Sequence, residues 1–409
     1  MCEFFDDKEC LDPQEREAGL LAQLDGFIEF ARGNCPYFGA LLAELGGPVA
    51  SREALASLPV TRKSQLIELQ EERGPFGGLN PEGGRVERLF QSPGPINEPE
   101  NTGNDWWRMG RAFYAAGFRP GQLVQNCLSY HLSPGGFILD SGARACGCTV
   151  IPAGPGQTEL QLEINASLKP QGYCGTPSFL KILLDRAAER GQTLSFTHAL
   201  VTGEALPGAL RQVFQDAGIE VRQAYATADI GLIAFESEPD QGLVLAEDIL
   251  VEIVRPGSGE PVAQGEVGEV VVTSFNRDYP LIRFATGDLS AMMDGPSACG
   301  RSNGRIKGWM GRADQTTKVK GMFVHPVQLE RLRSRVAGMS RIRALVERQA
   351  HNDQLTLLCE PQAEPPLPES EVATLARALL KLGAEVNWVE PGSLPRDGIV
   401  IEDRRPSPS

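Results

Sequence analysis

Several side chains capable of chemistry follow short apolar stretches that are typical of buried strands. Tyr225 and Asp229 lie in YATAD, Glu204 in VTGEAL, Asp288 in ATGD and His131 in SYHLSPGG. A carboxylate can accept hydrogen bonds from hydroxyl groups or hold a cation, and a tyrosine ring can stack on a planar ligand. Because ligand sites in parallel sheets lie at the carboxyl ends of the strands, these turns mark the predicted site.

Each of these residues also has a structural interpretation, which the sequence alone leaves open. Tyr225 could be a core aromatic at a strand end, Asp288 a turn residue after a glycine, and Glu204 a charge in the first turn of the following helix. The remaining histidines are isolated, and we interpret them as structural or exposed: His198, His325 and His351.

Other catalytic and metal-binding patterns are missing from the sequence. There is no GxSxG segment and no Ser-His-Asp order, which argues against a hydrolase. The nine cysteines are scattered without a CxxC pair, so neither a disulfide framework nor a zinc knuckle is expected. Cys146 and Cys148 are interpreted as small core residues.

The elements that must position these turns alternate along the middle of the chain. Between residues 105 and 229, amphipathic helical segments separate short apolar strands, which predicts βαβ units and a largely parallel sheet. Residues 13–46 have helical periodicity, and 52–72 predict two short helices around the turn LPVTRKSQ. After residue 240 the apolar period becomes two, which indicates a β-rich segment, and the last residues mix helices with strands.

Length and composition set limits on the class of protein. The 409 residues suit two or three domains, and a net charge of −14 argues against a general nucleic-acid binder. Every apolar run is interrupted, and the first residues lack the pattern of a secretory signal, so we expect a cytoplasmic protein without a membrane span. The 45 glycines and 30 prolines gather partly in residues 74–104, which read as one long loop.

Taken in order, the turns and their neighbours resemble the phenylacetate–CoA ligase family of the adenylate-forming superfamily. LPVTRKSQL is similar to the family's LPFTTKxDL, and GCTVIPAGPGQTELQ to its GATVIPxxxGxTExQ. CGTPSFL is similar to the family's CGTPSYL, YATAD stands where the family has YGxTE, and YPLIRFATGDL where it has YPxIRYRTGDL. GRADQTTKVKGMFVHPVQLE occupies the place of GRxDDMLIxRGVNVFPxQIE, so the similarity covers almost the whole chain.

The resemblance implies an α/β fold with two domains. A large N-terminal AMP-binding domain, residues 1–312, would hold mainly parallel sheets plus the β-rich segment. A small α+β cap, residues 313–409, would move on a hinge at Asp314. The family's reaction joins a carboxylic acid to ATP, releases pyrophosphate and then transfers the acyl group from AMP to coenzyme A. The implied partners are therefore ATP/AMP, Mg²⁺, coenzyme A and a small, aromatic carboxylic acid, with a homodimer as the considered assembly.

Several residues match the family's binding positions, and their roles come from the resemblance. Tyr225 would stack on adenine, Asp288 would accept the ribose hydroxyls, and Asp229 stands where the family has a glutamate that binds Mg²⁺. Tyr130 and His131, with Gly135 and Gly136, match the wall of the acyl pocket. The remaining nucleotide contacts implied in this way are Glu204, Ala226, Thr227 and Arg312.

The phosphate loop departs from the family's SSGTTGKP. Here the stretch is SPGPINEP, in which Pro93 and Pro95 lack the N–H groups that could bind phosphate. Glu98 replaces the lysine, so the sign of its interaction with a phosphate is reversed. The degenerate loop comprises Ser92, Gly94, Asn97 and Glu98.

The C-terminus departs as well. The family's last catalytic lysine has Ile399 in its place, and no lysine follows Lys381. Lys318 and Lys320, near the hinge, are the candidates for a replacement cation. Two hypotheses therefore stay open: an acyl-CoA ligase, or a diverged homologue that binds AMP, acyl adenylate or acyl-CoA as a sensor or accessory protein.

Overall fold

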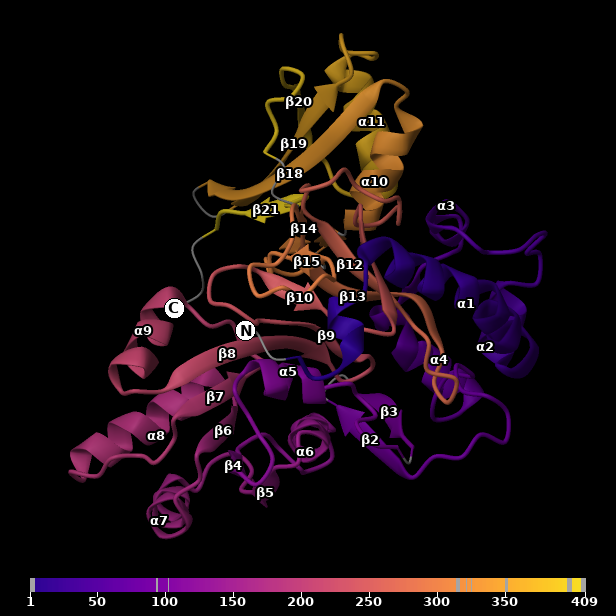
Figure 1. Cartoon of the computed structure of the whole chain (residues 1–409). Coiled ribbons are helices and arrows are strands. Elements are labelled where there is room, and N and C mark those ends of the chain that lie inside the picture. Colours follow the sequence, from indigo (N-terminus) through magenta and orange to yellow (C-terminus); the bar gives the residue numbers. More distant parts are fainter. Residues whose placement is uncertain are drawn as a thin grey trace. The chain divides into compact units, whose positions relative to one another are not determined.

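The chain divides into two compact units in a computed structural model (Figure 1). One unit contains Met1–Val251, Val271–Thr286 and Met292–Trp309, and the other contains Glu252–Val270, Gly287–Ala291 and Met310–Ser409. The predicted boundary between residues 312 and 313, like the mobility of the cap, stays a prediction. The structure describes residues 4–92, 95–101, 103–313, 317–320, 322–324, 326–349, 352–395 and 399–405.

A nine-stranded sheet forms the centre of the first unit. Its order is β14-β15-β10-β9-β8-β7-β6-β4-β5, and the pairs from β5 to β8 are parallel whereas those from β8 to β14 are antiparallel. The predicted parallel sheet is confirmed. The strands are β4 (Leu123–Asn126), β5 (Thr149–Pro152), β6 (Gly172–Gly175), β7 (His198–Val201), β8 (Glu220–Thr227), β9 (Gly231–Phe235), β10 (Leu243–Leu245), β14 (Met292–Met293) and β15 (Arg305–Ile306).

Helices cover both faces of the parallel strands. Tyr173 of β6 packs in one core cluster with Leu183 and Phe214, whereas a side chain at the neighbouring Gly172 would meet Phe118. Since successive strand residues point to opposite faces, the segment after α5 lies on the other face. These helices are α5 (Gly110–Ala115), α6 (Gly135–Ala145), α7 (Thr158–Leu168), α8 (Pro177–Glu189) and α9 (Gly208–Asp216).

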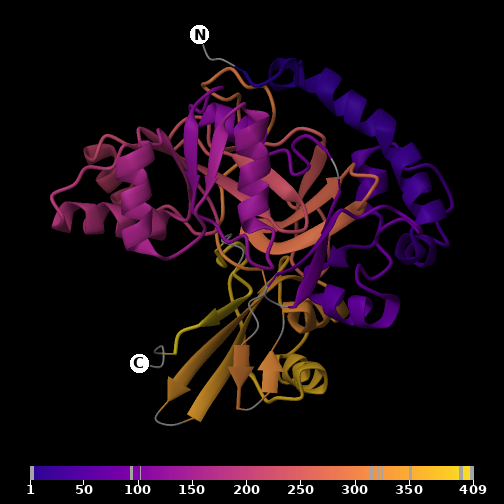
Figure 2. The same ribbon diagram turned by 90° about the horizontal axis from the view of Figure 1, so that it is seen from below.

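Two helix predictions need correction. The helical pattern over 106–118 yields only α5, because Arg108 has a φ of 62° and Asp105 accepts a hydrogen bond from the Gly110 N–H at 2.8 Å. The N-terminal pattern breaks before Pro36, which begins a second helix. Figure 2 shows these N-terminal helices beside one another. The elements are η1 (Asp7–Cys10), α1 (Pro13–Asn34), α2 (Pro36–Leu41), α3 (Arg52–Ala56), β1 (Thr61–Arg62), η2 (Lys63–Gln65) and α4 (Leu66–Arg73).

The stretch read as one loop, residues 74–104, contains an antiparallel hairpin. β2 (Arg88–Ser92) pairs with β3 (Ile96–Glu100), and Phe90 lies opposite Glu98. The loop prediction was wrong here because prolines and charged residues conceal the strands: Phe90 alternates with exposed neighbours in β2, but β3 buries Glu98, Pro99 and Glu100 in succession. Pro99 is compatible with a two-stranded ladder, where one edge of the strand needs no partner.

A second sheet confirms the predicted β-rich segment. Its order is β1-β13-β12-β11, and β1 pairs in parallel with β13 through Thr61 opposite Phe284. The three long strands of this sheet are almost completely buried, which explains their continuous apolar stretches. The long strands are β11 (Ile249–Val254), β12 (Gly268–Ser274) and β13 (Leu281–Ser290).

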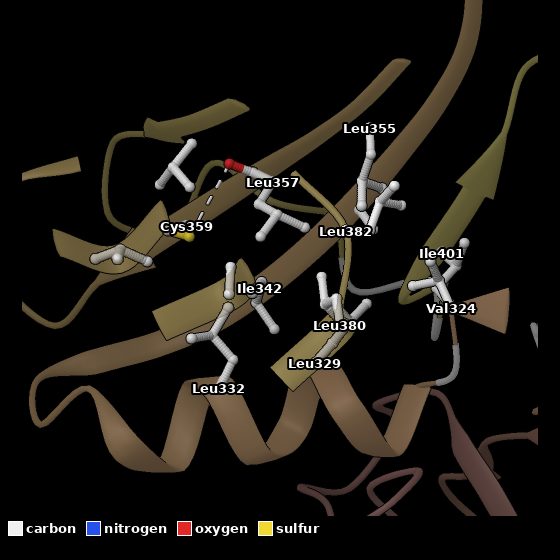
Figure 3. Packing of buried hydrophobic residues seen from close by; sticks show 14 of the residues in the cluster. Val324, Leu329, Leu332, Ile342, Leu355, Leu357, Cys359, Leu380, Leu382 and Ile401 are labelled. Atoms are coloured by element: carbon white, nitrogen blue, oxygen red, sulfur yellow. Dashed lines mark hydrogen bonds between the residues drawn. The ribbon is translucent and has the colours of Figure 1, made fainter. Parts of the chain in front are cut away.

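The C-terminal residues form a four-stranded sheet with two helices, and Figure 3 shows the core between them. Leu329 and Leu332 of α10 pack with Ile342, Leu357 and Leu380. The elements are β16 (Thr317–Val319), β17 (Met322–Val324), α10 (Pro326–Arg335), β18 (Met339–Gln349), β19 (Asn352–Pro361), α11 (Glu369–Leu380), β20 (Glu385–Trp388) and β21 (Ile401–Asp403). Within the described residues, no helix is long and apolar enough to cross a membrane.

Candidate active site

The end of β8 and the turn after it hold a connected group of predicted site residues. The Tyr225 hydroxyl donates to Thr286 Oγ1 at 3.1 Å, which fixes the phenol ring against β13. Ala226 and Thr227 continue β8, and the register shifts between Tyr225 and Ala226. Thr227 Oγ1 then accepts the Ile230 N–H at 3.2 Å. Three residues that were predicted from one short motif thus end β8, directly before the tight turn at 228–230.

Asp229 lies inside this turn, and its side chain is completely buried. The following Gly231 has a φ of 80°, and a Cβ there would lie 2.7 Å from the Trp107 Cβ. Only glycine fits this backbone conformation next to the indole without strain. The turn is therefore tied to Trp107, and Asp229 points inward rather than into solvent.

Lys63 was missed as a site residue, although it lies in the LPVTRKSQL segment. Its Nζ contacts Asp229 Oδ2 at 2.6 Å, and about a quarter of its side chain (27%) is exposed. The parallel pairing of β1 with β13 brings this lysine to Asp229 across 166 positions of sequence. The place of Lys63 directly after the strand Thr61–Arg62, within the motif that resembles the family's, was the available signal. The structure thus supplies a cation next to the predicted metal ligand.

In the β2–β3 hairpin, which stands in the place of the family's phosphate loop, side chains of the protein form hydrogen bonds with the backbone. Glu98 accepts hydrogen bonds from the Ser92 hydroxyl and, at 3.3 Å, from the Ser92 N–H. Gln70 of α4 binds the Asn97 backbone twice, accepting from its N–H at 2.8 Å and donating to its carbonyl at 2.9 Å. These backbone groups are thus already satisfied within the protein. Gly94, which was predicted to belong to this loop, lies outside the described residues.

Glu98 is a buried carboxyl next to a second one. It is 1% exposed, and burial followed by the charge of Asp229 raises the pKa of Glu98 to about 7. The Ser92 hydroxyl and the Lys63 ammonium oppose this shift. Tyr279 is close enough for both carboxylates to raise the pKa of its phenol further, after the larger effect of burial. The position of the family's lysine thus belongs to a buried acidic group.

Glu204 joins two of the predicted turns. Its carboxylate accepts from the Ser178 hydroxyl at 2.9 Å and from the Ser178 N–H at 3.3 Å. The turns after β6 and β7 are therefore connected at the carboxyl end of the sheet. Glu204 is exposed, so a ligand can reach it there.

Asp288 forms an ion pair with Arg312 within the second unit. Arg312 Nη1 lies 2.9 Å from Asp288 Oδ1, and the two residues are also a backbone bridge pair. Gly287 has a φ of 77°, and a Cβ at this position would lie 2.7 Å from Arg312 Nη2. The two predicted ribose-binding residues are therefore adjacent, and the glycine of ATGD leaves room for the guanidinium.

The turn after β4 carries the predicted acyl-pocket residues. The Tyr130 hydroxyl accepts from Asn126 Nδ2 at 2.7 Å and donates to Asp140 Oδ2 at 3.2 Å. Burial and then the charge of Asp140 raise the pKa of Tyr130, so the phenol stays neutral. Gly136 donates to the Ser129 carbonyl at 2.7 Å, which leaves no space for a side chain. The tyrosine is thus held in a fixed orientation.

Aromatic rings extend from this turn to the hairpin. Phe137 packs against Tyr130 and against Phe90, with ring centroids 5.2 Å and 5.1 Å apart. Phe90 in turn lies 6.2 Å from Trp107. His131 is exposed, and Gly135 has more space around its Cα than Gly136. The hairpin and the acyl-pocket turn therefore share one aromatic cluster, defined by Phe90, Trp107, Tyr130 and Phe137.

The predicted residues of the cap have a less complete description. Lys318 belongs to β16, Lys320 follows this strand with a φ of 47°, and Asp314 lies outside the described residues. Ile399 is exposed. Arg341 donates to the carbonyls of Leu394 and Pro395, at 2.7 and 2.9 Å.

Comparisons with known proteins agree with this geometry. A model of the AMP-binding enzyme family matches residues 129–276. The phenylacetate-coenzyme A ligase of Thermus thermophilus is 32% identical over 338 residues, 78% of this chain and 75% of that protein. The enzyme of the same name from Pseudomonas putida is 30% identical, over 79% of this chain and 78% of that protein. The solved structure of a 2-hydroxyisobutyryl-CoA ligase with 2-HIB-AMP and CoA has the same fold, with a TM-score of 0.69, 23% identity, and coverage of 95% of this chain and 91% of that one.

Proposed function

The chain belongs to the phenylacetate–CoA ligase family of adenylate-forming enzymes, and we propose that it is an acid–thiol ligase that works through an acyl adenylate. A carboxylate oxygen would attack the α-phosphorus of ATP, and the bond to pyrophosphate would break. The thiol of coenzyme A would then attack the acyl carbonyl, and AMP would leave with the electrons of the broken C–O bond.

The observation that carries this proposal is the Lys63–Asp229 pair in the turn after β8. Asp229 lies four residues after Tyr225 and holds the Lys63 ammonium at 2.6 Å, so a phosphate next to a stacked adenosine would meet a cation there. Negative charge that develops during phosphoryl chemistry is best stabilised by a preorganised cation in a water-poor site. Lys63 therefore takes the role that the family gives to lysines of its loop and C-terminus.

The other residues would bind and orient the nucleotide. Tyr225, with its hydroxyl fixed on Thr286, offers a ring face for adenine. Asp288, which Arg312 holds at 2.9 Å, would accept hydrogen bonds from the ribose hydroxyls, since a carboxylate can accept several at once. Mg²⁺, which neutralises phosphate charge when bound, fits at Asp229, because Oδ1 of this buried carboxylate has no hydrogen-bond partner among the described atoms.

We further propose that the acid is aromatic. The aromatic cluster lines the predicted acyl-pocket turn, and rings of this kind favour edge-to-face contact with an aromatic substrate. The neutral Tyr130 hydroxyl adds a polar group at the edge of that cluster. This arrangement supports an aryl or arylacetic acid over a short aliphatic one.

The direct test is pyrophosphate release from ATP with a panel of aryl, arylacetic and short-chain acids, followed by thioester formation after coenzyme A is added. The proposal expects both steps with the purified chain and the highest kcat/KM with an aromatic acid. Tyr130→Leu should raise KM for the aromatic acids and leave KM for ATP unchanged. Absence of both steps with every acid would contradict the ligase assignment.

The nucleoside half of the site has a separate test. Asp288→Ala should weaken AMP binding about tenfold or more, since a charged hydrogen-bond acceptor is lost. Calorimetry with AMP measures this, and Asp240→Ala, at an exposed position with no predicted role, is the control. An unchanged AMP affinity would remove Asp288 from the ribose site.

One observation favours a second candidate function, a binder of AMP, acyl adenylate or acyl-CoA without turnover. Glu98 occupies the lysine position of the phosphate loop and is buried there. That function expects no pyrophosphate release from the wild type and a gain of activity in a Glu98→Lys, Ile399→Lys double variant. The ligase function expects wild-type turnover, which the double variant lowers because a second cation would disrupt the pair with Asp229.

A further inference from the structure

An open cavity of about 370 Å³ lies in the first unit and is lined by residues without a predicted role in the reaction. This volume is within the range of about 300–1,000 Å³ that is typical of small-molecule sites. The wall consists of residues between 103 and 108, which precede α5, together with Asp248 and residues 275–278, which follow β12. The cavity is therefore a candidate site for a second ligand, separate from the nucleotide and the acid.

Two oppositely charged side chains of this wall, Asp105 and Arg108, form no ion pair with any described residue. Both residues are partly exposed, but Asp105 Oδ1 and Arg108 Nε are buried atoms without a hydrogen-bond partner among the described atoms. Burial lowers the pKa of Arg108 to about 10, and the carboxylates of Asp105 and Asp248 oppose this shift. Because buried charges and polar atoms are nearly always paired in folded proteins, these two groups need an explanation.

The backbone holds the two charges near each other without letting them pair. The Arg108 N–H donates to the Asp105 carbonyl at 2.8 Å, so both side chains leave the same turn. Asp105 Oδ2 accepts from the Gly110 N–H at 2.8 Å, and Arg108 Nη2 donates to the Ile230 carbonyl at 2.5 Å. Each charged group is thus anchored to a backbone group rather than to the opposite charge. The arrangement suits a ligand that brings one positive and one negative group.

The net charge of the wall argues for the same kind of ligand. Three carboxylates against two guanidiniums leave a net charge of −1, which disfavours a phosphate or another polyanion. A simple cation would leave Arg108 unpaired, and a simple carboxylate would leave Asp105 unpaired. A zwitterion satisfies both side chains. The charged groups counted here are those of Asp105, Arg108, Asp248, Arg277 and Asp278.

The cavity also has an aromatic part. Trp106 and Phe275 line it, and both are partly exposed. The Phe275 ring packs against Phe27, with ring centroids 5.2 Å apart, so its position is fixed from behind. Aromatic rings favour offset or edge-to-face contact with another ring. The apolar portion of the ligand is therefore expected to be a flat ring.

We propose that this cavity binds an aromatic α-amino acid, with the ligand's carboxylate on Arg108, its ammonium on Asp105 and its ring beside Trp106 and Phe275. Hydrogen bonds between ionised groups are the strong ones, and a guanidinium matches the geometry of a carboxylate. The inference goes beyond the proposed ligase function, because the wall shares no residue with the proposed site. Arg108 nevertheless connects the two, since it also holds the Ile230 carbonyl in the turn after β8.

The first experiment is calorimetric titration of the full chain, without nucleotide or acid, with L-phenylalanine and three derivatives. L-Phenylalaninamide lacks the carboxylate, N-acetyl-L-phenylalanine lacks the ammonium, and N-acetyl-L-phenylalaninamide lacks both. Phenylalanine should bind about tenfold or more tightly than each derivative, since each loses a charged hydrogen bond. Equal binding of the doubly blocked derivative would overturn the zwitterion site, and so would the absence of phenylalanine binding.

Two variants give a reciprocal test of the charged groups. Asp105→Asn keeps an acceptor for the Gly110 N–H but loses the charge, so phenylalanine should bind about tenfold more weakly and N-acetyl-phenylalanine more tightly than to the wild type. Arg108→Gln should also weaken phenylalanine binding about tenfold, but it should strengthen the binding of phenylalaninamide. Opposite changes for oppositely charged derivatives are not expected from damage to the fold, and their absence from both variants would overturn the site.

Two exposed charges of α8 provide the matched controls. Asp185→Asn and Arg186→Gln lie outside the cavity and should bind all four ligands as the wild type does. Tyr130→Leu should leave phenylalanine binding unchanged as well. If Tyr130→Leu weakens this binding and Arg108→Gln does not, phenylalanine occupies the predicted acyl pocket and the proposal is wrong.

Folding of each variant is checked by circular dichroism, and if Arg108→Gln fails to fold, Asp105→Asn and the series of derivatives decide. Turnover is measured separately. An active chain that does not bind phenylalanine contradicts the cavity site alone, whereas an inactive chain that binds phenylalanine through Asp105 contradicts the proposed ligase alone.

Discussion

The turn after β8 and the β2–β3 hairpin approach the same buried group but use opposite means. The turn keeps the pattern of its family, with Tyr225 fixed on Thr286 and Asp229 held inside a glycine turn. The hairpin has lost that pattern, since its backbone groups are bound by Gln70 and its lysine is replaced by Glu98. One region keeps the residues proposed to bind the nucleoside, and in the other the backbone groups of Asn97 are engaged by Gln70.

Under the proposed function, the positive charge for the phosphate has moved to another segment of the chain while the fold is kept. Lys63, delivered by β1, contacts Asp229 from a segment that precedes the hairpin. A phosphate site needs positive charge at one place, but neither the identity of the residue nor its position in sequence is fixed. The two regions are therefore one electrostatic unit, and each prediction below tests this coupling.

The largest expected effect comes from Lys63→Met. Turnover should fall about a hundredfold, because a preorganised cation next to the reacting phosphate is removed. Steady-state pyrophosphate release measures the loss, and Lys63→Arg, which keeps the charge, should lose much less. Equal kcat/KM in the methionine variant and the wild type would contradict the proposed role of Lys63 as the cation for the reacting phosphate.

The pH dependence of stability tests the acidic side of the coupling. The folded-state pKa of Glu98, about 7, exceeds its ordinary value of 4.5, so the folded protein holds this proton more tightly than the unfolded chain. Wild-type stability should therefore fall as pH rises from about 4.5 through about 7, and Glu98→Gln should lack this fall. The difference in unfolding free energy should reach no more than about 3 kcal/mol.

Urea unfolding without divalent cations, at about pH 5 and about pH 8, measures this difference. Glu100→Gln provides the control, since its curve should run parallel to that of the wild type. Parallel curves for Glu98→Gln as well would mean that the carboxyl is not perturbed by its neighbours.

Gly231→Ala tests how firmly the turn after β8 is built. The new Cβ would clash with Trp107 in addition to the strain of a φ of 80°. Gly265→Ala is a matched control, because Gly265 has a φ of 76° but nothing within 4 Å of its Cβ position. We expect Gly231→Ala to lose about 2 kcal/mol more stability than the control, as measured by denaturant unfolding. Equal losses would show that Trp107 does not constrain the turn.

The smallest effect is expected from Gln70→Ala. Two hydrogen bonds to the Asn97 backbone would be lost, with a cost of about 1 kcal/mol in unfolding free energy. We expect faster amide hydrogen exchange at Asn97 and unchanged exchange in β8. This result would show that Gln70 stabilises the hairpin without affecting the turn after β8. Unchanged exchange at Asn97 would show that the hairpin does not depend on this clamp.

The order of elements could be predicted because local patterns encode it. Alternating helices and apolar strands gave the parallel sheet, and period-two segments indicated the β-rich region. The β2–β3 hairpin was not predicted because prolines interrupt its sequence pattern. Strand β18 was not predicted because its apolar residues alternate with arginines such as Arg341 and Arg343. Composition favours a loop at the hairpin and a solvated segment at β18, but both segments pair with neighbouring strands in the folded protein.

The sequence by itself determined the family and the loss of the two lysines, and it predicted a nucleoside-binding turn, because short motifs keep their spacing along the chain. Only the tertiary structure decided that Lys63 meets Asp229 and that Glu98 is buried beside them. The physical reason is that charge interactions depend on distance and burial, and neither can be read from a spacing of 166 residues. What first reads as a defective phosphate loop is, in three dimensions, half of an acidic pair.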